Sequence, residues 1–203
     1  MKDEIVPPPV QGKNTSLETS VELANSVEAR ETFKRAYKRM LNPPVWHKVS
    51  GFASAKLMLT NERGSEENRL AEEGDYFRID ILGPGPSLGD GYDWVRVESI
   101  KNDPNAGEDA ETYGMTLRPS AAPGKQETAH FFKETATSSF LIRREGNRVT
   151  ASYHGRNEIP NNDTNNTKDN VRNSLVAMGA FAGLSELQWK ALIKGFLEEE
   201  IGG

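Results

Sequence analysis

The chain has 203 residues, which suits one domain with long loops and is too short for two full domains. It carries 25 basic and 30 acidic residues, and the resulting net charge of -5 argues against a general nucleic-acid surface. Cysteine is absent from the sequence, which excludes disulfides, thiolate metal sites and thiol nucleophiles. We therefore expect one folded domain.

The first fifteen residues differ in composition from the rest. They include Pro7, Pro8 and Pro9, which fix an extended backbone, and residues 1–15 are therefore predicted to form a flexible, proline-bearing arm. This segment has neither the basic start nor the apolar stretch of a signal peptide. No run of apolar residues is long enough to span a bilayer. Together these features predict a cytoplasmic protein with no membrane partner, in which residues 16–203 form a single domain.

Residues 16–41 have the pattern of one long amphipathic helix. Apolar residues recur there at intervals of three and four: Leu17, Val21, Ala24, Val27, Phe33, Ala36, Tyr37 and Met40. Glutamates gather toward the start of this segment, and lysines and arginines gather toward its end, which complements the helix dipole. Asn42-Pro43-Pro44 ends the pattern. We predict a long N-terminal helix over 16–41.

Residues 45–154 have the pattern of short strands. Apolar residues alternate with polar ones, as at Phe77, Ile79 and Ile81, and Glu145-Gly146-Asn147 predicts a hairpin turn. Six or seven such strands follow one another with connections too short for crossover helices. We therefore predict an α+β fold with a mainly antiparallel sheet that is barrel-like or strongly curled. The pattern from Asp75 to Ile100, a strand, a Gly/Pro-rich loop and a Trp-Val-Arg-Val strand, resembles a hairpin of a small SH3-type barrel.

The chain ends in helices. Residues 155–170 are rich in asparagine and predict an exposed loop, after which 171–199 form a helical tail of two helices. Gly183 separates these two helices, and Ser185 with Gln188 has the spacing of a capping box at the start of the second.

Motifs of known catalytic chemistry are missing. The segment 83–91 begins Gly-x-Gly, but Pro84 and Pro86 lack the amide donors that a phosphate loop requires. Neither Gly-x-Ser-x-Gly nor Ser-x-x-Lys occurs. His47, His130 and His154 stand singly, without the spacing that aligns two imidazoles on a metal. The sequence therefore predicts no catalytic residue, no metal and no cofactor, and it favours a protein that is not an enzyme.

The strongest candidate for a binding segment is 154–158, at the end of a predicted strand. Arg156 offers a planar guanidinium to a carboxylate or phosphate, and His154 and Asn157 add polar contacts beside it. The alternative is an ordinary loop in which Arg156 pairs with a neighbouring side chain.

Two further residues are candidates for binding. Trp94 follows the Gly/Pro-rich loop, where an exposed aromatic ring serves as a recognition platform, although a tryptophan in a strand also suits the core. His130 would contribute to a pocket at the loop edge of the sheet if it meets His154 and Arg156.

Three functions remain open on these grounds. The leading interpretation is a binding or assembly module that engages a protein partner through its strand-loop face. The first alternative is a small-ligand-binding protein or enzyme with a pocket at the loop edge of the sheet, for which a small anionic ligand is an option. The second alternative is a homo-oligomeric structural subunit that shares its apolar last helix between chains. Net acidity counts against nucleic acid as a partner.

Overall fold

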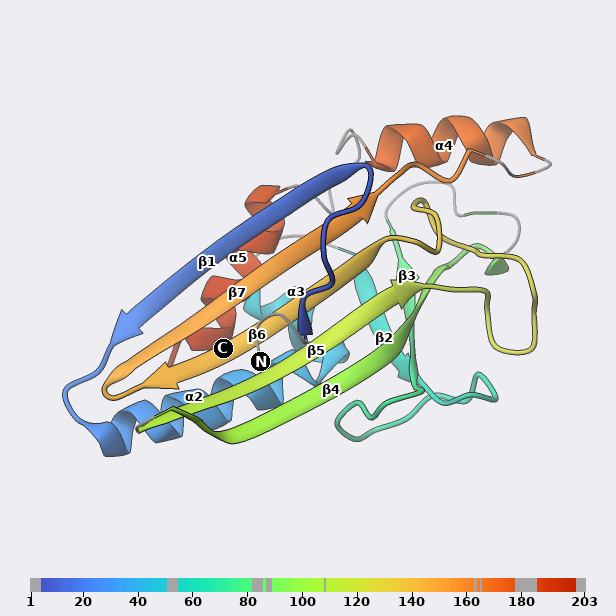
Figure 1. Cartoon of the computed structure of the whole chain (residues 1–203). Coiled ribbons are helices and arrows are strands. Elements are labelled where there is room, and N and C mark those ends of the chain that lie inside the picture. Colours follow the sequence, from blue (N-terminus) through green and yellow to red (C-terminus); the bar gives the residue numbers. More distant parts are fainter. Residues whose placement is uncertain are drawn as a thin grey trace.

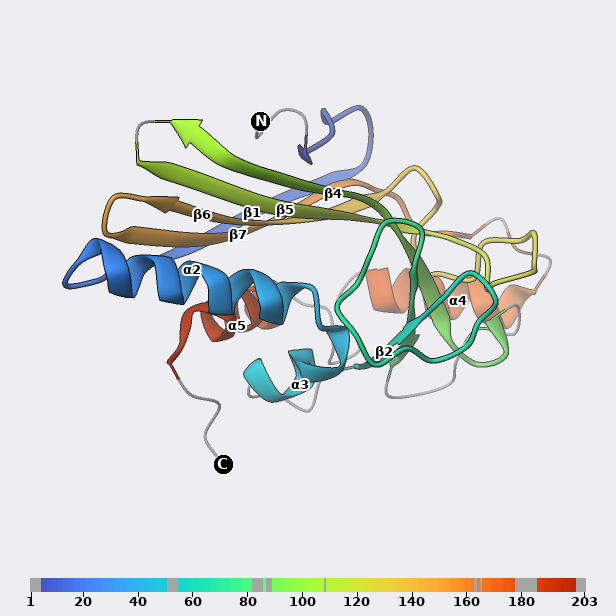
Figure 2. The same cartoon turned by 90° about the horizontal axis from the view of Figure 1, so that it is seen from below.

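The computed structural model describes residues 5–50, 55–81, 86, 89–107, 109–162, 164, 166–177 and 186–199. They form an antiparallel sheet of seven strands with helices against one of its faces (Figure 1; Figure 2). The elements in chain order are β1 (Lys13–Glu22), α2 (Ser26–Met40), the 3-10 helix η1 (Pro43–Val45), α3 (Trp46–Val49), β2 (Lys56–Thr60), β3 (Tyr76–Asp80), β4 (Asp93–Gly107), β5 (Ala110–Pro119), β6 (Thr137–Glu145), β7 (Arg148–Glu158), α4 (Thr167–Ala177) and α5 (Glu186–Leu197).

The sheet is open, which corrects the predicted barrel-like closure and the likeness to an SH3-type barrel, although β3 and β4 do pair antiparallel. The strand order is β1-β7-β6-β5-β4-β3-β2, and within the described residues β1 pairs only with β7 and β2 pairs only with β3. Helices α2 and α5 lie against the face that closure would have wrapped around (Figure 2). That helical layer already buries the apolar side of the sheet, so closure is not needed to cover it.

The predicted helix over 16–41 is wrong in its first half, because residues 13–22 form the edge strand β1. Leu17 and Val21 are four residues apart, a spacing that fits one face of a helix and one face of a strand equally well. Asn25 marks the true helix start: its side-chain oxygen accepts hydrogen bonds from the backbone N–H groups of Val27 and Glu28, both at 3.0 Å. Helix α2 therefore begins at Ser26.

Residues 45–49 also differ from the prediction, since they belong to η1 and α3 in place of a strand. Proline at the first helical position favours this turn, because its missing N–H has no intrahelical partner there in any case. The chain then enters β2 at Lys56.

Trp46 lies at the centre of the core between the sheet and the helical layer. Its ring makes edge-to-face contacts with Phe77, Phe140 and Phe196, at centroid distances of 5.7, 5.0 and 5.8 Å. Its indole N–H donates to the carbonyl oxygen of Arg39 at 3.0 Å and so satisfies the end of α2. One side chain thus joins α2, α3, α5 and the sheet. We call this side of the sheet the inner face.

The opposite, outer face of the sheet is crossed by residues 5–12 (Figure 1; Figure 2). Ile5 is only 2% exposed, and its carbonyl oxygen accepts hydrogen bonds from the hydroxyls of Thr116 and Ser139. Gly114 makes room for it, because a Cβ at that position would lie 2.7 Å from the Ile5 side chain. This part of the predicted arm is therefore packed on β5 and β6.

The two C-terminal helices, α4 and α5, agree with the predicted helical tail, but the predicted loop over 155–170 is too long, since β7 extends to Glu158 and α4 begins at Thr167. The capping serine, Ser185, and most of the Gly/Pro-rich segment 83–91 lie outside the described residues. Among the helices that the structure describes, none is long and apolar enough to cross a membrane.

Candidate ligand-binding site

Arg156 and His154 lie together on the outer face at the end of β7, where β1 pairs with that strand. The Arg156 guanidinium donates to the carbonyl oxygen of Thr15 at 2.6 Å and to the hydroxyl of Ser16 at 2.9 Å. The imidazole of His154 lies 3.1 Å from the same Ser16 hydroxyl. In this structure the polar groups of both residues hold β1 against β7. A role in ligand binding stays a prediction.

Asn157 has a backbone φ of 56°, which interrupts the regular strand. Its side-chain oxygen accepts hydrogen bonds from the backbone N–H groups of Val10 at 2.7 Å and Gln11 at 3.3 Å. Asn157 therefore anchors the segment that crosses the outer face.

Trp94 is 6% exposed, and it packs in a small cluster with Ala122 and Ala129. Its indole N–H donates to the carbonyl oxygen of Gly89 at 3.2 Å. The ring is therefore enclosed, which favours the core alternative over a free platform; its part in recognition stays a prediction.

His130 follows Ala129 directly and is also buried. Burial and, to a smaller extent, the positive charge of Arg172 lower the pKa of the His130 imidazole to about 3. The neutral ring accepts a hydrogen bond from the backbone N–H of Phe132 at 3.0 Å. Next to it, Arg172 of α4 forms a buried bidentate ion pair with Asp93. This group joins α4 to the start of β4.

A second polar group, which the sequence did not reveal, lies on the inner face at the end of β7. The hydroxyl of Tyr153 is 3.2 Å from the Glu158 carboxylate and 3.4 Å from the Ser138 hydroxyl. Burial raises the pKa of Glu158 and that of Tyr153. The Trp189 ring stacks on Tyr153 at 4.6 Å. A carboxyl and a phenol are thus held between the sheet and α5.

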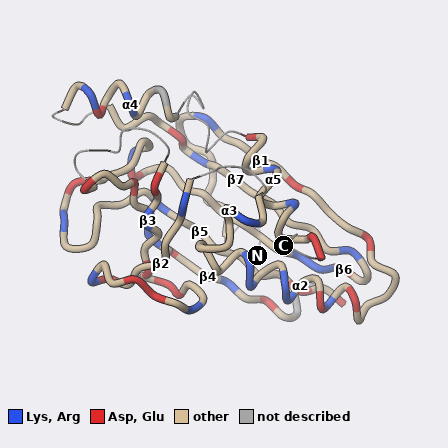
Figure 3. Tube along the Cα trace, turned by 180° about the vertical axis from the view of Figure 1, so that it is seen from behind, with Lys and Arg blue, Asp and Glu red and all other residues tan. Residues whose placement is uncertain are grey.

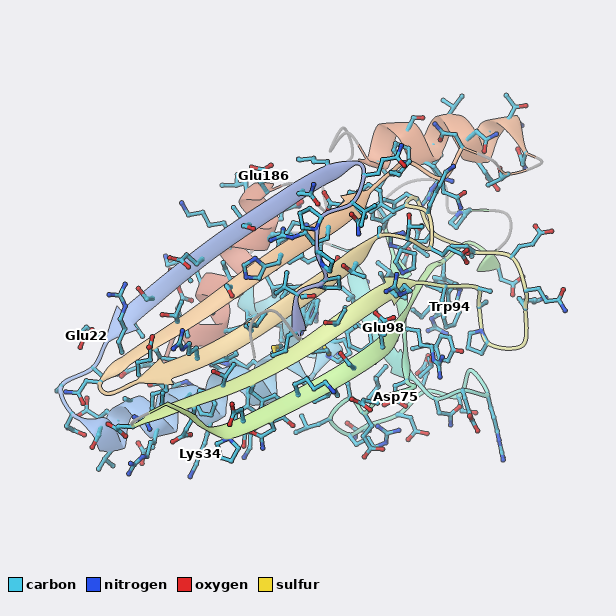
Figure 4. The ribbon with its side chains drawn as sticks, viewed as in Figure 1. Glu22, Lys34, Asp75, Trp94, Glu98 and Glu186 are labelled. Atoms are coloured by element: carbon cyan, nitrogen blue, oxygen red, sulfur yellow. The ribbon has the colours of Figure 1, made fainter. Side chains whose placement is uncertain are left out.

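A cleft of about 490 Å³ opens at the loop edge of the sheet, on the outer face of β4 and β5. The strands supply Arg96, Glu98 and Arg118 as its floor. Its walls come from residues 73–74 before β3 and from the connection between β5 and β6. Figure 4 shows Glu98, Trp94 and Asp75 at this end of the sheet. The volume lies within the range of pockets that hold small ligands.

The first wall is fixed by a buried carboxylate. Asp75 is 5% exposed and accepts two hydrogen bonds from the Arg69 guanidinium, at 2.6 and 2.9 Å. Backbone hydrogen bonds from Gly74 to Val97, and from Val97 to Asp75, attach this wall to β4.

The second wall is fixed by hydrogen bonds along the connection between β5 and β6. The backbone N–H of Ser120 donates to the carbonyl oxygen of Trp94, and the N–H of Ala129 donates to that of Ser120, both at 3.0 Å. The Arg118 guanidinium donates to the carbonyl oxygen of Glu134 at 3.0 Å. Hydrogen bonds within the chain therefore hold both walls.

Charges of both signs line the cleft, as they do the loops beside β2 and β3 (Figure 3). Arg118 and Glu98 neutralise each other through two hydrogen bonds of 2.8 and 2.9 Å. Neither the Arg96 guanidinium nor the Glu134 carboxylate forms an ion pair within the described part of the chain.

None of the five predicted binding residues lines this cleft. The sequence held one signal for the cleft. Arg96 belongs to the same Trp-Val-Arg-Val strand as Trp94, and alternation places Arg96 on the opposite face from Val95 and Val97.

For a metal, the described residues offer no group of three His, Asp or Glu side chains that could serve as ligands.

The chain resembles several solved structures at low sequence identity. Ara h 8.0201 is 14% identical with a TM-score of 0.34, over 91% of this chain and 99% of that one. Ginseng major latex-like protein 151 from Panax ginseng is 12% identical with a TM-score of 0.32, over 83% and 95%. Protein Ms6760 from Mycobacterium smegmatis is 13% identical with a TM-score of 0.36, over 93% and 94%.

Neither a family model nor a curated protein matches the sequence. The TM-scores of the solved structures are low, so the function proposed for this chain rests on its own geometry.

Proposed function

We propose that this protein binds a small polar ligand in the cleft at the loop edge of its sheet. This function corresponds to the small-ligand alternative among the sequence interpretations. The observation that supports it is the cleft of about 490 Å³, whose two walls are held by internal hydrogen bonds. A site formed in advance loses little conformational entropy when a ligand enters, so a few polar contacts are enough for specific binding.

The polar side chains that line the cleft favour a polar ligand. Ser120, Gln126 and Thr128 bring hydroxyl and amide groups to the cleft, and Arg96 brings a guanidinium that no carboxylate neutralises within the described residues. An apolar molecule would bury these groups without hydrogen-bond partners, at a cost of about 1–3 kcal/mol each. A polar molecule replaces the water on them with its own donors and acceptors.

The test is a screen of small carboxylates, amines, amides and sugars against ¹⁵N-labelled protein. We expect binders to shift the amide resonances of Arg96–Glu98, Arg118–Ala121 and Thr128. Gln126→Trp fills the cleft from an exposed position and should weaken such binding at least about tenfold, as expected when several hydrogen bonds are lost.

Lys125→Trp is the matched control, because Lys125 is the exposed neighbour of Gln126 and does not line the cleft. It should bind as the unmodified protein does. A screen without shifts at the cleft, or binding that survives Gln126→Trp, would reject the proposal.

A further inference from the structure

We infer that the ligand of this cleft is a zwitterion, with a carboxylate bound by Arg96 and an ammonium bound by Glu134. This inference rests on the proposed function and names the chemical class of its ligand. It follows from the charged groups of the lining and from the partners that the fold already gives them.

Three of the five charged side chains in the lining are already engaged. Arg118 and Glu98 form their bidentate pair, and the Arg118 guanidinium also binds the carbonyl oxygen of Glu134. The Glu73 carboxylate accepts a hydrogen bond from the backbone N–H of Ile100 at 2.7 Å. These groups shape the cleft and have few free positions left for a ligand.

The other two side chains, Arg96 and Glu134, have no hydrogen-bond or ion-pair partner among the residues that the structure describes. Arg96 is exposed, and its guanidinium carbon lies 6.0 Å from the centroid of the Tyr76 ring, a contact that does not use its N–H donors. Glu134 is exposed, and its backbone oxygen accepts a hydrogen bond from Arg118. Within the described part of the chain, the cleft therefore presents one unpaired cation and one unpaired anion.

This pairing disfavours ligands that carry a single charge. A simple anion that reaches Arg96 also meets the carboxylates of Glu73, Glu98 and Glu134. A simple cation that reaches Glu134 also meets two guanidiniums. A molecule with both charges turns each repulsion into an attraction, which is how charge patterns create specificity.

The neutral part of the lining suits the middle of such a molecule. Ser120, Gln126 and Thr128 supply hydrogen-bonding groups that carry no charge. The volume of about 490 Å³ exceeds what one ammonium and one carboxylate fill when directly joined. The two charges of the ligand are therefore separated by a spacer.

The experiment is an NMR titration at low salt with a series of ω-amino acids: glycine, 4-aminobutanoate, 6-aminohexanoate and 8-aminooctanoate. We expect one chain length to bind best and to shift the cleft amides. The monocarboxylate and the monoamine of the same chain length should each bind about tenfold more weakly, because each lacks one charge-assisted contact. Added salt should weaken the zwitterion most.

Variants assign each charge to its partner. Arg96→Gln should reduce the affinity for the zwitterion to that for the monoamine, and Glu134→Gln should reduce it to that for the monocarboxylate. Arg63→Gln and Glu127→Gln are the controls, since both residues are exposed and neither lines the cleft. They should leave the affinity unchanged.

The two proposals fail in different ways. Equal affinity for zwitterion, monocarboxylate and monoamine, or a zwitterion affinity that ignores Arg96→Gln and Glu134→Gln, would overturn the inference about ligand class while cleft binding stands. If neither this series nor the polar screen shifts the cleft amides, the proposed function fails with it.

Discussion

The buried environment of His130 makes the stability of the protein depend on pH. Its imidazole is buried, and burial lowers the pKa from 6.5 to about 3. A histidine with a lowered folded-state pKa contributes stability above its unfolded pKa, and that contribution disappears as the pH falls toward the folded value. The full difference corresponds to about 5 kcal/mol, at 1.36 kcal/mol for each pKa unit.

We therefore expect urea denaturation to show a loss of stability between about pH 6.5 and pH 4 that is much smaller in His130→Asn. His47→Asn, at a partly exposed position of α3, is the control and should lose stability as the unmodified protein does. The raised pKa of Glu158 acts in the opposite direction, because its contribution is lost as the pH rises. A His130 imidazole resonance that titrates near pH 6.5 in the folded protein would contradict this account.

At the scale of elements, the sequence predicts those whose pattern has a single reading. The strands around Phe77 and Ile79, the hairpin at Gly146 and the C-terminal helices follow from alternation, turn chemistry and helical spacing. The segment 13–22 does not, because its apolar spacing fits both a strand and a helix. Only the pairing of β1 with β7, a contact between distant parts of the chain, decides between the two.

Gly195 sets how closely α5 approaches the end of α3. A Cβ at this position would overlap the carbonyl oxygen of Val49, a backbone atom that cannot move without shifting α3. Gly195→Ala should therefore displace α5 and cost about 3 kcal/mol, although alanine has the higher helix propensity.

Urea denaturation followed by tryptophan fluorescence measures this effect, since Trp46 and Trp189 both pack in that layer. Lys194→Ala changes the exposed neighbour and should be nearly neutral. If Gly195→Ala were as stable as Lys194→Ala, the close approach of the two helices would be wrong.

At the scale of the whole molecule, the cleft could not be predicted from the sequence, because its residues are far apart along the chain. The cleft combines residues from three separate stretches, near 74, 97 and 118–134, and only the strand order brings them together. Arg156 and Asn157 have the chemistry of a binding segment, but the same order places β1 and residues 10–11 against them. Residue types can be read from a sequence, whereas the partners of those residues depend on the topology.

Segments of the chain lie on both faces of the sheet: helices pack on the inner face, and residues 5–12 lie across part of the outer face. Ile5 is the buried contact on the outer side, so Ile5→Ala should leave a cavity over Gly114 and cost about 3 kcal/mol. Val10→Ala removes methyl groups from a residue of the same segment that is 84% exposed, and it should change stability by less than about 0.5 kcal/mol.

Chemical denaturation of the two variants, with amide hydrogen exchange at Thr116 and Ser139, tests whether the Ile5 contact stabilises the fold. Ile5→Ala should lower stability and speed exchange at both amides, because the hydroxyls of these residues hold the Ile5 carbonyl in place. Equal stability of the two variants would mean that the Ile5 contact on the outer face does not stabilise the fold. The apolar burial that stabilises the fold would then lie on the inner face, between the sheet and the helical layer.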